Sequence, residues 1–167
     1  MAVLTVTIKE ELTLNGSNRG SENITSIGSV TQSFNRIVTL PANGGAGSTQ
    51  TTVAVFKDTV DTDIRVGING AIDDGDAKYI RVTNLDADNN VTLSLQIAAD
   101  GTNAADNSAS VLLAPGKSLI LGGSADSIAV DDDAATPITA TNLVHLESIL
   151  AINETNDTTQ LEVFIAS

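Results

Sequence analysis

The chain has 167 residues, no cysteine, only 2% aromatic residues and a formal net charge of −13. This length suffices for one domain with a substantial core, whereas the lack of cysteine excludes disulfides, thiolate metal sites and cysteine nucleophiles. So acidic a chain repels phosphate backbones and offers few rings for stacking, so we expect no nucleic-acid partner and disfavour a sugar-binding role.

The N-terminal third differs from the rest of the chain in charge. Residues 1–57 carry four basic and three acidic groups, a net of +1, while the remainder carries four basic and eighteen acidic groups, a net of −14. The N-terminal third is therefore the first place to look for protein contacts. Its opening residues lack the pattern of a secretory signal, and no apolar run approaches the about 20 residues of a membrane span. We expect synthesis in a cytoplasm and no membrane partner.

Strand patterns, in which apolar and polar side chains alternate, run along most of the chain. In 91–97 every odd position is apolar, and in 159–165 the residues Leu161, Val163 and Ile165 share one face. Threonine, valine and isoleucine dominate these runs, as suits a pleated surface. Further runs begin at Val3, Val53, Ile64, Tyr79, Val111 and Leu119.

Turn residues separate the runs. Asn15-Gly16 and Asn69-Gly70 predict type I′ turns. Pro115-Gly116 occupies the central positions of a type II turn, which predicts a hairpin over 110–121. Longer connections are expected at 41–50, 86–90 and 98–107.

Many short strands without helical patterns between them predict an all-β fold, an antiparallel β-sandwich of jelly-roll-like form. We expect a single β-sandwich domain over 1–167. Residues 1–14 are its predicted N-terminal docking strand or arm, because an exposed strand can add to a neighbour's sheet.

One segment fits two structures. Residues 143–152 fit a helix through Leu143, Leu146 and Leu150, or a strand with Val144, Leu146, Leu150 and Ile152 on one face. We favour the strand, because 153–158 has the composition of a loop leading into the last strand.

No motif for catalysis or phosphate binding is complete. His145 is the single histidine, so any Ser-His-Asp mechanism must pass through it, and no G-x-S-x-G sequence accompanies it. The glycine-rich segment 44–49 lacks the lysine of a phosphate-binding loop. We interpret His145 as a histidine on a half-exposed strand and expect no enzyme, no catalytic residue and no bound cofactor.

Three aspartate clusters are the best candidates for a metal site, since calcium prefers oxygen ligands. They lie at 73–76, 86–88 and 131–133. Asp86, Asp88 and Asn90 imitate the start of an EF-hand loop, but Val91 replaces its glycine and Ile97 its final glutamate. We therefore interpret the clusters as acidic surface loops and predict no metal site, with one incidental structural ion as the alternative.

Several strand and turn segments resemble virion structural proteins of marine tailed bacteriophages. They cover about half of the chain: 1–16, 36–41, 78–86, 90–97, 114–118 and 161–167. The resemblance implies a β-sandwich protein without enzymatic activity, located in the virion on a capsid or tail. It carries no site residue to this chain.

The expected function is accordingly that of a capsid decoration or cement protein. Its partners would be the major capsid protein or other virion proteins, and a homo-oligomer is expected because symmetry multiplies a modest contact. A tail appendage, fibre adaptor or host-recognition module is the alternative. A hydrolase or metal-dependent enzyme that depends on His145 or the aspartates is the third hypothesis.

Overall fold

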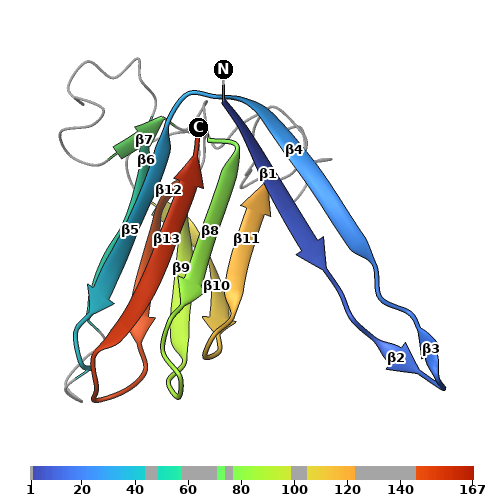
Figure 1. Ribbon diagram of the computed structural model, residues 1–167. Coiled ribbons are helices and arrows are strands. Elements are labelled where there is room, and N and C mark those ends of the chain that lie inside the picture. The colour runs from blue at the N-terminus through green and yellow to red at the C-terminus, as the bar shows by residue number, and fades with distance from the viewer. Residues whose placement is uncertain (1, 44–48, 58–70, 74–76, 99–104, 123–145) are drawn as a thin grey trace.

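The computed structural model describes residues 2–43, 49–57, 71–73, 77–98, 105–122 and 146–167. All regular secondary structure of these residues is β, which confirms the all-β prediction. Two packed sheets form a sandwich, and a long hairpin leaves one end of it (Figure 1).

The sandwich consists of two sheets. The first has the order β10-β9-β12-β6-β7, with β6 at Gln50–Lys57, β7 at Ala71–Asp73, β9 at Val91–Ala98, β10 at Ala105–Leu113 and β12 at Leu146–Asn153. The second has the order β11-β8-β13-β5, with β5 at Ser33–Leu40, β8 at Tyr79–Asn84, β11 at Ser118–Gly122 and β13 at Thr159–Ala166. Neighbouring strands are antiparallel, as expected for a sandwich, except for the short parallel pair β6–β7.

The core lies between the two sheets and follows the predicted alternation. Leu161, Val163 and Ile165 of β13 are at most 1% exposed, and Val91 and Leu93 of β9 are fully buried. These side chains belong to one apolar cluster that joins both sheets. Burying each such side chain contributes about 1.5–3 kcal/mol, so this cluster is the main source of the sandwich's stability.

The turn at Pro115-Gly116 forms as predicted, but the hairpin does not. Gly116 has a φ of 66°, and the Lys117 amide donates to the Ala114 carbonyl at 3.1 Å, as a type II turn requires. However, β10 pairs with β9 in the first sheet and β11 pairs with β8 in the second. The predicted hairpin over 110–121 is therefore wrong, because the turn carries the chain from one sheet to the other.

Strand β12 confirms the choice of a strand for the ambiguous segment, though its inward face differs from the predicted one. Ile149 and Ala151 are fully buried, whereas Leu150 and Ile152 are only partly buried. The register against β9 shifts between Leu146 and Ser148. One extra residue reverses the faces of everything that follows it, which is why simple alternation from Leu146 selects the wrong side.

The hairpin that leaves the sandwich spans residues 2–30 and is called the arm. It contains β1 (Ala2–Lys9), β2 (Thr13–Leu14), β3 (Ser17–Asn18) and β4 (Glu22–Val30). Its end turn has Asn15 at φ 51° and Gly16 at φ 75°, which confirms the type I′ turn. The second expected turn of this type, Asn69-Gly70, lies outside the described residues. So do Ile64, where a strand was expected to begin, and residues 44–48 of the expected loop 41–50.

Candidate interaction surface

The base of the arm is fixed to the outer face of the second sheet. Ile27 of β4 is 2% exposed and forms an apolar cluster with Tyr79 and Ala166, which Leu4, Val6, Val30 and Phe164 complete. The rings of Tyr79 and Phe164 meet edge to face, with centroids 6.0 Å apart. Burial also raises the pKa of Tyr79 above its ordinary value. The arm therefore has a fixed origin on the sandwich.

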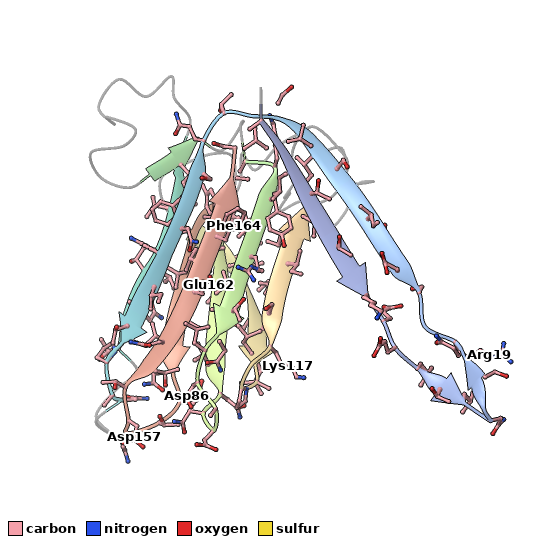
Figure 2. All side chains as sticks on the ribbon, viewed as in Figure 1. Arg19, Asp86, Lys117, Asp157, Glu162 and Phe164 are labelled. Carbon is pink, nitrogen blue, oxygen red and sulfur yellow. The ribbon has the colours of Figure 1, made fainter. Side chains whose placement is uncertain are left out.

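Polar contacts reinforce this junction. Lys78 Nζ donates to the Ser29 carbonyl at 2.7 Å. The segment that joins β4 to β5 is held as well, since the amides of Thr31 and Gln32 both donate to the Ser167 carbonyl, at 2.7 and 3.0 Å. Figure 2 shows Phe164 at this end of the sandwich and Arg19 near the far tip of the arm.

Beyond its base, the arm exposes large apolar side chains. Five of the nine large hydrophobic residues exposed in the described part of the chain lie on it: Val3 at 63%, Ile8 at 46%, Leu12 at 54%, Leu14 at 55% and Ile24 at 59%. Ile27 is the one buried residue of the arm. A lone two-stranded ribbon has too little apolar contact to be stable by itself in water. The register places Val3 and Ile24 on one face of the arm and Ile8, Leu12 and Leu14 on the other, so both faces are candidates for contact with a partner.

The free edge of β1 presents backbone groups without a described partner. The Glu10 amide donates to the Ser21 carbonyl at 2.7 Å, so even-numbered residues of this strand bond toward β4. The peptide groups of Thr5 and Thr7 therefore point away from β4. Residues 2–8 carry no charge and no proline, so this edge lacks the usual features that prevent strand pairing.

The free edge of β4 differs from that of β1 because a β-bulge interrupts it. Ala2 pairs with Val30 and Leu4 with Ile27, so β4 contains an extra residue between these pairs. Ser29 lies there with a φ of 54°, whereas the terminal charges, Lys9 on β1 and Glu22 on β4, are common to both strands. Bulges disfavour the addition of another strand. Of the two edges of the arm, β1 therefore has the one suited to pairing.

The sequence analysis anticipated one of the two sides of the arm. The docking strand expected at 1–14 is one side of the arm, and residues 17–30 form the other side. The Asn15-Gly16 turn was the available signal that a second strand follows. Glu22–Val30 alternates poorly, however, with glycine and serine at 28–29, so periodicity alone does not identify it.

Of the three aspartate clusters, only 86–88 lies wholly within the described residues. Asp86 Oδ1 accepts the amides of Asp88 at 2.9 Å and Asn89 at 2.8 Å. These two backbone hydrogen bonds lower the pKa of the Asp86 carboxyl below its ordinary value. The carboxylate thus shapes its own loop. Among the described residues no three potential metal ligands gather in one place.

The other candidate residues cannot be placed. His145, Asp131–Asp133 and Asp74–Asp76 lie outside the described residues.

Buried asparagines organise two loops at the end of the sandwich opposite the arm's base, where Figure 2 labels Asp86 and Asp157. Asn84 is fully buried, and its Nδ2 donates to the carbonyls of Asn89 and Leu113. Asn153 is 2% exposed and donates in the same way to the carbonyls of Pro41 and Asp157. In both cases Oδ1 accepts the amide two residues on. The two asparagines are satisfied structural groups, which accounts for their burial.

The described residues include no helix long and apolar enough to cross a membrane. Comparison with known proteins found no matching family, no similar curated protein and no similar solved structure. The interpretation of this chain therefore depends on its own residues and geometry.

Proposed function

We propose that this chain is a structural protein of a tailed-phage virion, a capsid decoration or cement protein that acts through its surface and has no catalytic role. The observation that carries the proposal is the arm, a ribbon that exposes five large apolar side chains beside a sandwich with a packed core. Such a division suits a protein whose body is displayed while its extension contacts a neighbour.

The charge distribution supports this role. The arm carries Lys9 and Arg19 against Glu10, Glu11 and Glu22, a net of −1. The rest of the chain therefore accounts for −12 of the total of −13. A strongly acidic body stays soluble at high local concentration, and a nearly neutral arm approaches a partner with little repulsion.

The strand order supports a finer description of the fold. The sheets β5-β13-β8-β11 and β6-β12-β9-β10 each contain four long strands, and most connections pass from one sheet to the other. This strand order supports a jelly roll, which we include in the proposal. Jelly rolls occur in viral capsid proteins and also in lectins, so this support is by analogy of fold.

The test is to count copies of the chain in purified particles by quantitative mass spectrometry against the major capsid protein. A decoration protein follows the capsid lattice, so we expect on the order of tens to hundreds of copies per particle. A variant with Leu12→Asp and Leu14→Asp should be lost from particles, while Leu112→Asp on the sandwich, also an exposed leucine, should be retained.

The outcomes separate the alternatives. A few copies per particle, located at the tail by immunogold labelling, would replace the capsid proposal with a tail appendage or adaptor. Absence of the chain from particles would refute both virion roles.

A further inference from the structure

We propose that two copies of this chain associate through the free edges of β1, which pair antiparallel about a two-fold axis and join two arms into one four-stranded sheet. The inference concerns self-association of the purified chain and does not depend on its place in a virion.

The free edge of β1 is open to pairing with another strand. The peptide groups of Thr5 and Thr7 point outward and have no described hydrogen-bond partner, and residues 2–8 combine high β propensity with no charge. A sequence of this kind at an exposed edge pairs with another strand unless charge, proline or a bulge prevents it. On β4 the bulge near Ser29 provides that protection.

The strand that pairs with β1 can be β1 of a second copy. Antiparallel pairing of two identical edges is symmetric, so each outward peptide group of one β1 finds its counterpart in the other. Because β4 is protected, each arm offers one pairing edge. The association therefore closes at two copies and does not continue into a fibre.

Charge supports the antiparallel arrangement. It places the Lys9–Glu11 end of each β1 beside the base of the other arm, where Lys78 is bonded to the Ser29 carbonyl. That end of the arm carries Lys9, Glu10, Glu11 and Glu22, a net of −2, which is opposite in sign to Lys78. Opposite charges therefore face each other at both ends of the antiparallel pair, and their attraction offsets part of the repulsion between two acidic bodies.

The experiment is sedimentation equilibrium of the full chain over a concentration series. We expect the mass to rise from 17.1 kDa to twice that value and to level off there. Thr5→Pro removes one outward amide without touching the bonds to β4, and should weaken association by at least about tenfold. Ser26→Pro is the matched control, because Ser26 is the cross-strand partner of Thr5 and its amide points to the opposite edge.

Association by this edge requires Ser26→Pro to dimerise like the unmodified chain. Equal weakening by both proline variants would show that damage to the arm is responsible and would overturn the assignment of β1. A second variant, Thr5→Lys with Thr7→Lys, keeps the amides and adds charge to the edge, so it should also be monomeric. An unmodified chain that stays at 17.1 kDa at all concentrations, or whose mass grows beyond a dimer, refutes the proposal.

Discussion

The arm and the sandwich are built from the same kind of sequence and differ in what covers it. Leu4 to Ile8 alternates much as Val91 to Ile97 does, yet Val91 and Leu93 are fully buried while Ile8 is 46% exposed. A second sheet covers the strands of the sandwich, whereas the arm meets the sandwich only at its base. Alternation thus specifies a strand with two faces, and the tertiary arrangement decides whether the apolar face becomes core or contact surface.

The largest difference is expected from removing a leucine in each region. Leu161→Ala opens a cavity between the sheets, where Leu161 is fully buried, and should lower the free energy of unfolding by about 2–5 kcal/mol. Leu14→Ala on the arm, 55% exposed, should change it by no more than about 0.5 kcal/mol. Urea denaturation of both variants measures the contrast, and similar losses would mean that the arm is part of the folded core.

The next largest effect is expected from removing a buried polar group that stabilises the sandwich. Asn153→Ala removes the amide donor of the Pro41 and Asp157 carbonyls, of which Asp157 keeps only the Thr155 hydroxyl at 3.3 Å, and it leaves the Thr159 hydroxyl without its acceptor. Stranding such groups costs about 1–3 kcal/mol each where they are buried, so we expect a loss of at least about 2 kcal/mol in urea denaturation. Asn156→Ala, at an exposed position of the same loop, should be neutral.

A substitution in the arm should disturb the arm alone. A β-carbon at Gly20 would overlap the Glu10 carbonyl oxygen, so Gly20→Ala forces the two sides of the arm apart there. We expect this to destabilise the arm by about 1–3 kcal/mol. Amide exchange should accelerate at residues 10–21 and remain unchanged in β13. Gly28→Ala, whose β-carbon would have nothing within 4 Å, is the matched control. Faster exchange throughout the sandwich would contradict the separation of the two regions.

The smallest effect concerns acid. Backbone hydrogen bonds from Asp88 and Asn89 lower the pKa of Asp86 in the folded state. The ionised carboxylate therefore stabilises the fold at any pH above the unfolded-state pKa, which is about 4. This stabilisation is lost as the pH falls through the lower, folded-state pKa of Asp86. Asp86→Asn should therefore flatten the acid side of a plot of urea midpoint against pH. An unchanged plot would show that the loop at 86–90 does not depend on this carboxylate.

Much of the sandwich could be predicted from local pattern. The inward faces of β9 and β13 follow alternation, and the turn at Pro115-Gly116 follows from a proline with a fixed negative φ and a glycine that accepts a positive one. In the arm, the Asn15-Gly16 turn follows in the same way from two residues that accept a positive φ. These features depend on neighbours in sequence, so the sequence shows them directly.

The rest depends on contacts between distant residues. Nothing near Pro115 indicates that the strands on either side belong to different sheets, and the extra residue in β12 is visible only against β9. The position of the arm depends on Ile27 meeting Tyr79 and Ala166, residues that lie far along the chain. Charge composition predicts that the N-terminal third makes the protein contacts, and this stays a prediction. The second strand of the arm and the difference between its two edges are visible only from the strand pairing.

The pairing of β13 with β5 and β8 also has a consequence for the order of folding. Hairpins with local partners form in about 1–10 μs, so the arm can close soon after its own residues leave the ribosome. The second sheet cannot, because its middle strand comprises Thr159–Ala166 and joins β5, more than a hundred residues earlier. During synthesis the arm therefore pairs its own strands only transiently, because a lone hairpin is marginally stable. It becomes fixed when Ala166, in the last strand of the chain, joins Ile27 and Tyr79.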